Sequence, residues 1–315
     1  PPAMDTTTDV PTLRASMDAS DDEDDLVLGM HAKADAPVVL YADGLSAVFS
    51  VERLTRAISK YTNLGEDDAR GAAFNISQSL PNTIAVEQLT AQVIKELSTQ
   101  EDCAFQDAAG EYDYEMLRRT IPSQYTDVCR SLRENTIVVN NTVRTAPRVS
   151  MEFYDFVEAN ASILQDLLET HAHERRTLNY YAMATLRRTY LLKVRGATAE
   201  LPEHMYLREA IVVTNFDLSE IPETFRLLSQ HFYTHSTPTI CNAGTPNQQL
   251  ASCFLLEFEE DSIDGIFSTL HKMALISKAG GGIGANMGRI RNEMSPISAG
   301  GESNGIIPVI KLMED

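Results

Sequence analysis

Tryptophan is absent from this 315-residue sequence, cysteine occurs only four times, and basic side chains are scarce relative to acidic ones. Cys103, Cys129, Cys241 and Cys253 have no CxxC spacing and no histidine at metal-ligand offsets. This argues against a disulfide framework or a zinc ribbon, and no metal site is expected. The 26 Lys and Arg residues against 45 Asp and Glu residues give a formal net charge of −19. Binding to nucleic-acid phosphates needs clustered positive charge, so no nucleic-acid partner is expected.

Long apolar runs are also missing. No stretch approaches the roughly 18 consecutive apolar residues of a membrane-spanning helix, and the start lacks the basic and apolar blocks of a secretory signal. We therefore expect a cytoplasmic protein with no membrane partner. The 43% of apolar residues can fill the cores of about two domains. Because the chain starts at Pro1 and ends inside a helical pattern at Asp315, we expect it to be a piece of a longer protein.

The amino-terminal third divides into a tail and a small domain. Residues 1–36 carry an acidic run and almost no aliphatic periodicity, so we expect a disordered acidic tail. Residues 37–100 predict a hairpin of strands 38–41 and 45–49 around an Asp43-Gly44 turn. Ser50 is placed to cap a helix that starts at Val51, and further helical patterns cover residues 66–80 and 86–97.

The rest of the chain changes from helical to mixed patterns. Residues 101–147 predict a helical connector, with helices near 114–121 and 125–132, and a linker over 135–147. Residues 148–235 predict a helical domain with helices at 151–168, 177–192 and 221–232. Within residues 236–315 a strand (253–258), a helix (263–277) and a second strand (285–289) alternate, which is typical of α/β architecture. The fold class is therefore mixed α and α/β.

Glycines cluster at residues 280–288. Their spacing approximates a dinucleotide-binding fingerprint, but a helical pattern precedes them where that motif requires a strand. A phosphate-binding loop is also excluded, because Lys278 comes before the glycines instead of after them. Two interpretations remain open, a plain tight turn and a backbone surface that lies close to a ligand.

Three further segments carry chemically useful side chains. Residues 236–246 offer hydroxyls and amides around two prolines, which suits either an anion- or sugar-binding segment or an ordinary rigid loop. Cys253 on an apolar strand is, taken alone, more typical of a buried inert thiol. Asp261 and Ser262 precede a helix, where either a helix cap or a carboxylate that binds a hydroxyl is possible.

Taken together, these segments resemble the large catalytic chain of ribonucleotide reductase, most closely the class I, eukaryotic-like form. The matching text is STPT at residues 236–239, NAGT at 242–245, QLASCFLL at 249–256, DSI at 261–263 and ALISKAGGGIG at 274–284. Upstream, TLRRTYLL at 185–192 and PEHM at 202–205 resemble the same family's helical region. The resemblance covers about residue 148 to the end and implies that residues 236–315 start a ten-stranded α/β barrel.

The resemblance implies roles for individual residues. Cys253 matches one of the two thiols that supply reducing equivalents when the substrate 2′-hydroxyl leaves as water. Ser236, Thr237 and Ser252 fall on substrate-contacting positions, with Thr237 beside the diphosphate, and Gly282 lies where the backbone approaches the substrate. The expected substrate is a ribonucleoside diphosphate. Cys241 matches no catalytic position and is expected to be core.

A second set of residues resembles the family's site for an allosteric deoxynucleotide at a homodimer interface. Its members are Asp261, Ser262, Ile263, Lys278 and Arg291. Asp261 would hold the deoxyribose hydroxyl and Arg291 would reach the phosphates, while residues 295–301 resemble a flexible loop around this effector. Residues 37–100 resemble the family's ATP-binding cone, in which Asp43, Gly44 and Arg53 remain but a basic pair is replaced by Tyr41-Ala42. We therefore expect a degenerate cone with little charge for a triphosphate.

The resemblance predicts an oxidoreductase of deoxyribonucleotide biosynthesis, which serves DNA replication. It implies no directly bound cofactor, a radical from the metallocofactor of a small subunit, and dNTP and ATP effectors. The radical cysteine, the second thiol and the proton-accepting carboxylate would lie in a carboxy-terminal portion beyond Asp315, so this piece alone is expected to be inactive. The alternative is a non-catalytic paralogue that binds nucleotides and serves in regulation or dimerisation. A class II, cobalamin-dependent reductase shares the Cys253 segment and is the alternative within the family.

Overall fold

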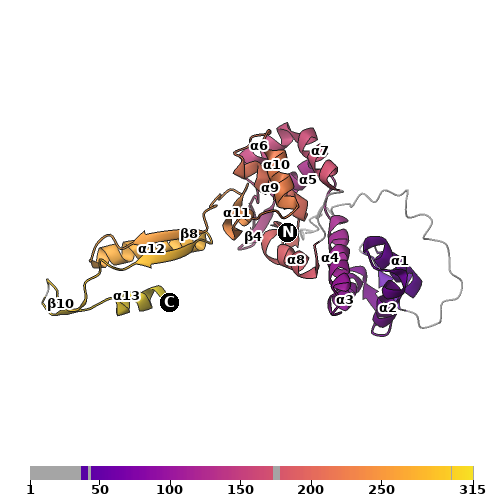
Figure 1. Ribbon diagram of the computed structural model, residues 1–315, viewed down its shortest axis with the longest axis horizontal. Helices are drawn as coiled ribbons and strands as arrows, with labels where there is room; N and C mark the ends of the chain where they lie inside the picture. The colour runs from indigo at the N-terminus through magenta and orange to yellow at the C-terminus, as the bar shows by residue number, and fades with distance from the viewer. Residues whose placement is uncertain (1–36, 42–43, 173–177, 299, 315) are drawn as a thin grey trace, which may run out of the picture. The chain divides into compact units, whose positions relative to one another are not determined.

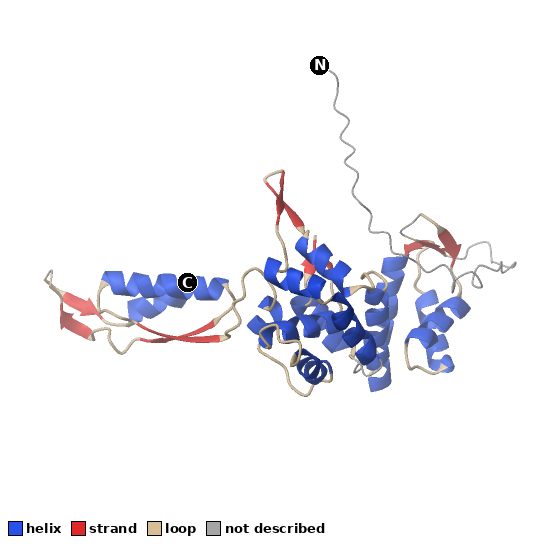
Figure 2. Cartoon of the chain, turned by 90° about the horizontal axis from the view of Figure 1, so that it is seen from above, coloured by secondary structure: helices blue, strands red, loops and turns tan. Residues whose placement is uncertain are grey.

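The computed structural model describes residues 37–41, 44–172, 178–298 and 300–314. The predicted acidic tail, residues 1–36, and Asp43 lie outside these ranges. The described residues divide between two compact units, one within the ranges 1–131 and 175–202 and the other within the ranges 132–174 and 203–315. The units thus interleave along the sequence instead of following the consecutive segments predicted above. Figure 1 labels the elements, and Figure 2 shows helices predominating over short strands.

The first unit contains a small sheet covered by helices. Its elements are β1 (Val38–Leu40), β2 (Ser46–Val48), α1 (Val51–Tyr61), α2 (Glu66–Ser77), β3 (Thr83–Ala85), α3 (Val86–Ser98), α4 (Cys103–Arg118), α8 (Tyr180–Thr185), the π-helical turn η3 (Leu186–Tyr190), β6 (Lys193–Val194) and β7 (Ala197–Thr198). The predicted hairpin and the helix after Ser50 are confirmed, and the Ser50 side chain accepts from the Arg53 N–H. Strand β3, which pairs in parallel with β1, was not predicted from the sequence.

The core of this unit extends beyond residue 100. Buried Leu54, Ile58 and Leu97 pack in one cluster with Tyr112 of α4, and Tyr180 of α8 lies against the same cluster. Helix α4 and the segment before α8 approach closely at Gly110, where an added Cβ would lie 1.9 Å from the Leu178 carbonyl oxygen. The predicted small domain is therefore continuous with part of the predicted connector.

The second unit begins with a hairpin where the sequence predicted a linker. Helix α5 (Tyr125–Arg133) leads into β4 (Thr136–Val139), which pairs antiparallel with β5 (Thr142–Thr145). Asn140 and Asn141 both have positive φ, 51° and 58°, which are the angles that a tight two-residue hairpin turn requires. Asparagine tolerates this backbone region better than most residues, so the Asn pair that suggested a linker forms the turn.

The helices of this unit are α6 (Met151–Ala159), α7 (Ala161–His171), α9 (Pro202–Val213), α10 (Ile221–Ser229) and α11 (Thr237–Asn242). The single helix predicted for residues 151–168 is in fact α6 and α7, which are separated by Asn160 with non-helical angles (φ −120°, ψ 24°). The predicted helix 177–192 is shorter and ends in η3. No helix within the described ranges has the length and apolar character needed to cross a membrane.

The carboxy-terminal part of the second unit has a β–α–β arrangement. Its elements are β8 (Cys253–Glu257), α12 (Ile263–Lys278), β9 (Gly282–Asn286), β10 (Glu293–Pro296), β11 (Glu302–Asn304) and α13 (Ile307–Glu314). Strands β8 and β9 are parallel, with Cys253 opposite Gly282 and Glu257 opposite Asn286. The predicted second strand was placed three residues late, because the glycine run itself begins the strand. Phe258, Ile290 and Val309 form the core of this part.

Candidate functional site

The segment that leads into β8 is fastened to the short helix α11. Thr239 Oγ1 donates to the Leu250 carbonyl oxygen at 2.9 Å, and Asn242 Nδ2 donates to that of Gln249 at 2.8 Å. Residues 236–246, for which the sequence left open a binding segment or a rigid loop, therefore contain a helix that starts after Ser236. Ser236 Oγ also lies 3.3 Å from Thr239 Oγ1. The predicted substrate-contacting residues Ser236 and Thr237 are exposed at the start of this helix.

Helix α9 holds the other end of α11 through a buried guanidinium. Arg208 is only 1% exposed, and its Nη1 donates to the carbonyl oxygens of Ile240 at 3.1 Å and Ala243 at 2.6 Å. A buried cation needs acceptors of this kind, and the last carbonyls of a helix are not used by the helix itself. Arg208 therefore fixes α11 against the helical part of the second unit.

Cys253 lies on an exposed face of β8, at the very start of the strand. Residues on β8 alternate between exposed and half-buried, so Cys253 shares its face with Leu255 and Glu257. The Gly282 N–H donates to the Ser252 carbonyl oxygen at 2.7 Å, and Ser252 Oγ lies 3.6 Å from the Cys253 sulfur. The interpretation of Cys253 as a buried, inert thiol is therefore wrong.

The backbone around Gly282 leaves little space for a side chain at this position. A Cβ at this position would lie 3.3 Å from the Ser252 carbonyl oxygen, and the residue is exposed on the same side of the sheet as Cys253. The structure thus brings together Ser252, Cys253 and Gly282, and it ties the segment before them to the helix of Ser236 and Thr237. This arrangement offers a thiol, hydroxyls and uncovered backbone on one side of a strand pair.

A second group of predicted residues meets at the start of α12. Arg291 Nε donates to Asp261 Oδ2 at 2.5 Å, and Arg291 Nη2 donates to the Asp261 carbonyl oxygen at 3.1 Å. Ser262, not Asp261, is the helix cap, because its Oγ accepts from the Gly265 N–H at 3.0 Å. Ile263 follows with 71% of its surface exposed. In this chain, therefore, the two predicted effector ligands Asp261 and Arg291 are paired with each other.

Lys278 does not join this group within one chain. It is the last residue of α12, and a rise of 1.5 Å per residue puts it roughly 22 Å along the axis from Ile263.

Two ion pairs of acidic residues that precede Asp261 in the sequence were not predicted. Glu259 pairs with Lys272 at 2.9 Å and Glu257 with Arg289 at 3.2 Å. The acidic residues at alternate positions 257, 259 and 261 could have indicated this row of paired carboxylates, Glu257, Glu259 and Asp261.

The other predicted sites have simpler surroundings. Gly44 adopts φ 85°, as its turn requires, and Arg53 contributes its backbone N–H to the cap of α1. The first two residues of the predicted loop 295–301 lie in β10, and the remainder connects β10 to β11, with residue 299 outside the described ranges. The residues that the structure describes contain no group of three or more His, Cys, Asp or Glu side chains arranged to hold a metal ion.

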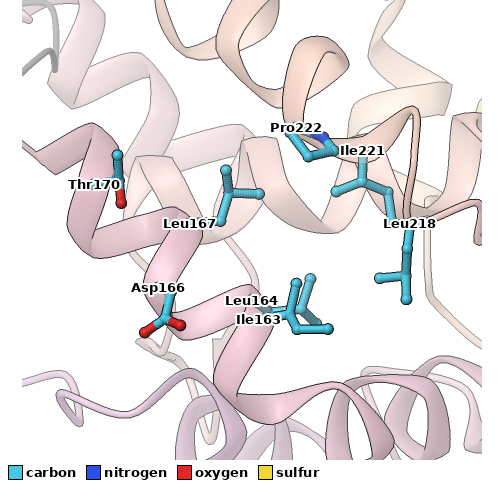
Figure 3. Close-up of a pocket in the computed structure, with 8 residues that line it drawn as sticks. All are labelled: Ile163, Leu164, Asp166, Leu167, Thr170, Leu218, Ile221 and Pro222. Atoms are coloured by element: carbon cyan, nitrogen blue, oxygen red, sulfur yellow. The ribbon is translucent and has the colours of Figure 1, made fainter.

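A cavity of about 230 Å³ lies between α7 and α10, apart from all these residues (Figure 3). Its lining is mainly aliphatic, including Ile163, Leu167 and Ile221, and Figure 3 shows Asp166 and Thr170 as the polar side chains. None of the residues predicted from the sequence as a site lines it.

A buried pair next to the Ser236 segment was also missed from the sequence. Glu209 of α9, whose side chain is 1% exposed, lies with its Oε1 2.7 Å from His235 Nδ1. The available signal was the charged pair Arg208-Glu209 between the apolar runs 205–207 and 210–213, since such side chains are almost never fully buried unless paired.

The described residues therefore define a mixed helical and α/β protein with an exposed thiol at the start of a parallel strand, opposite a glycine. Two family models match the chain. The all-alpha domain of ribonucleotide reductase matches residues 176–248, and the barrel domain of ribonucleotide reductase matches residues 251–315. The chain therefore belongs to the ribonucleotide reductase large-chain family.

Individual relatives agree with this assignment. The chain is 36% identical over 233 residues to the ribonucleoside-diphosphate reductase large chain of Schizosaccharomyces pombe, which covers 73% of this chain and 28% of the relative. It is 40% identical over 211 residues to the large subunit from Trypanosoma brucei brucei, covering 65% and 25%. It is 30% identical over 285 residues to large chain 2 of Saccharomyces cerevisiae, covering 88% and 32%. The chain thus spans between a quarter and a third of the length of these relatives.

Proposed function

We propose that this chain is the amino-terminal part of a ribonucleoside-diphosphate reductase large chain, which reduces ribonucleoside diphosphates to 2′-deoxyribonucleotides. The observation that carries this proposal is the exposure of Cys253 opposite Gly282, on a strand whose entry is tied to the helix of Ser236 and Thr237. The names of the relatives support the same substrate class. The remaining portion of the large chain would complete the ten-stranded barrel.

In this proposal Cys253 is a reductant. Its sulfur and that of a second cysteine each lose one electron and one proton and join as a disulfide, while the 2′-hydroxyl leaves as water and a hydrogen takes its place. The second cysteine, the radical-forming cysteine and the carboxylate that accepts the 3′-hydroxyl proton belong to the carboxy-terminal portion. The metallocofactor of a separate small subunit supplies the radical. Ser236, Thr237 and Ser252 bind the substrate, and Gly282 leaves room for it.

Protection of Cys253 from alkylation tests the proposed substrate site. The purified chain is treated with iodoacetamide, with and without ADP, CDP, GDP or UDP, and labelling of each cysteine is followed by peptide mass spectrometry. We expect a nucleoside diphosphate to slow labelling of Cys253 at least fivefold. Cys103 is also exposed and lies in the first unit, so it is the matched internal control and keeps its rate. Equal labelling of Cys253 with and without every nucleotide would contradict the proposal.

The start of α12 is the proposed effector site. Asp261, Ser262, Ile263 and Arg291 would bind a deoxynucleoside triphosphate, and the Asp261–Arg291 pair would separate so that the carboxylate holds the 3′-hydroxyl and the guanidinium a phosphate. Lys278 would act from the opposite end of α12, which suits a site shared between two copies in a homodimer. The proposed cytoplasmic location follows from the family and its role in DNA replication.

Calorimetry with dTTP and dATP separates this site from the degenerate cone. We expect dTTP to bind the wild-type chain, and Asp261→Asn to weaken binding about tenfold because the neutral amide is a poorer acceptor. Glu257→Gln, which removes the neighbouring carboxylate of the same row, is the matched control and keeps dTTP affinity. A second dATP-binding event per chain would show a working cone. Binding of dTTP without nucleotide protection of Cys253 would favour the regulatory paralogue instead.

A further inference from the structure

The buried carboxylate of Glu209 and the ring of His235 form a pair on the helical side of the proposed substrate site. Glu209 Oε1 and His235 Nδ1 are 2.7 Å apart, and the Glu209 side chain is 1% exposed against 29% for His235. The second oxygen, Glu209 Oε2, has no hydrogen-bond partner among the described residues. When Glu209 is ionised it can only accept hydrogen bonds, and Nδ1 is then the donor in this contact.

Burying a carboxylate lowers the stability of the fold, so a buried Glu209 indicates a role other than stabilisation. Burial raises the pKa of Glu209, while His235 and Arg208 act in the opposite direction. Tyr233 packs edge-on against the His235 ring, with centroids 5.1 Å apart, and so restricts the ring further. A leucine at position 209 would fill the same helix face without this penalty. The pair is therefore better explained by the segment that it holds in place, next to Ser236, than by a contribution to stability.

The pair holds the residue immediately before the proposed substrate-binding hydroxyls. His235 precedes Ser236, Ser236 Oγ lies 3.3 Å from Thr239 Oγ1, and Thr239 Oγ1 donates to the Leu250 carbonyl oxygen. Adjacent residues of α9 thus hold α11 at both ends, since Glu209 acts through His235 at the start and Arg208 donates to the final carbonyls.

We propose that Glu209 and His235 are positioning residues, which fix Ser236 and Thr237 in the orientation that binds the diphosphate of the substrate. This inference rests on the proposed function and adds two residues to its site. The pair acts through the backbone at Ser236 and makes no contact with the nucleotide. Because rotational freedom at Ser236 and Thr237 must be lost on binding, a fixed starting orientation increases affinity.

The Cys253 protection assay tests this inference with four variants. Glu209→Ala and His235→Ala each should raise the nucleoside diphosphate concentration needed for half-protection about tenfold. The double variant should lose no more than either single variant, because both changes break the same contact. Glu209→Gln keeps an oxygen that accepts from Nδ1 and should restore most of the affinity. It also guards against the chance that Glu209→Ala fails to fold.

Binding of dTTP at the start of α12 is the control for a general structural effect, and it should stay within twofold of wild type in every variant. Equal loss of diphosphate and dTTP affinity would overturn the inference, as would additive losses in the double variant. Unchanged protection in both alanine variants would overturn the inference alone and leave the proposed function standing. Absence of protection in the wild-type chain would overturn both.

Discussion

The buried histidine of α9 should make the second unit sensitive to mild acid. His204 is 5% exposed, and burial lowers its pKa to about 3 from an ordinary value of 6.5. Below pH 6.5 the unfolded chain binds a proton at His204 that the folded chain does not accept until the pH approaches 3. The folded state therefore loses stability as the pH falls. The loss is about 1 kcal/mol at pH 5.5 and about 3 kcal/mol at pH 4.5, relative to neutral pH.

Urea unfolding of the wild-type chain and His204→Gln at pH 7.5, 6.5, 5.5 and 4.5 measures this effect. Glutamine has no proton to gain in this range, so the variant lacks this contribution while every acidic residue titrates as in the wild type. Even if the substitution lowers stability at neutral pH, the stability advantage of the wild type over the variant should shrink by about 3 kcal/mol at pH 4.5. Parallel stability curves for the two chains would refute the reasoning.

Three sets of substitutions test the packing within each unit. Gly110→Ala should destabilise the first unit by about 3 kcal/mol or more, because its Cβ would lie 1.9 Å from a backbone oxygen. Gly71→Ala, in open space on α2, should instead stabilise the unit by about 0.5–1 kcal/mol. Thermal unfolding that ranks the two variants in the opposite order would contradict this prediction. Arg187→Met should destabilise by about 2 kcal/mol, as it leaves Asp113 buried without its charged partner, and adding Asp113→Asn should recover part of the loss in urea unfolding. Phe258→Ala, at a fully buried position, should destabilise the second unit by about 3–5 kcal/mol, and a change below about 1 kcal/mol would argue against this core.

The features predicted correctly from sequence depend on local chemistry. Ser50 before a helical pattern is a cap, and the apolar run after Cys253 indicates a strand, because neighbours along the chain determine both. The parallel pairing of Cys253 with Gly282 could not be predicted from such patterns, since a glycine run in isolation indicates a turn as readily as a strand. The resemblance to a family, not the glycine spacing, suggested that Gly282 lies near a ligand.

The features that were missed depend on contacts between distant segments. Strand β3 has only three residues and exists because it pairs with β1. The break at Asn160 interrupts an apolar pattern that continues through both helices, so periodicity alone joins them. The pairs Asp261–Arg291 and Glu209–His235 join residues 30 and 26 positions apart. A charge pattern shows that such residues need partners but does not show which partner each one takes.

The interleaved order of the two units has a consequence for synthesis of the protein. The chain passes between them at residues 131–132, 174–175 and 202–203. During translation, residues 1–131 therefore emerge before residues 175–202, and α8 cannot pack on α4 until the later segment has been made. Residues 132–174 likewise emerge before residues 203–315, which complete the second unit. Neither unit can be completed from one uninterrupted stretch of nascent chain on the ribosome. A single proteolytic cut between residues 174 and 175 would leave each unit assembled from both fragments, so that the two fragments would have to associate for either unit to stay folded.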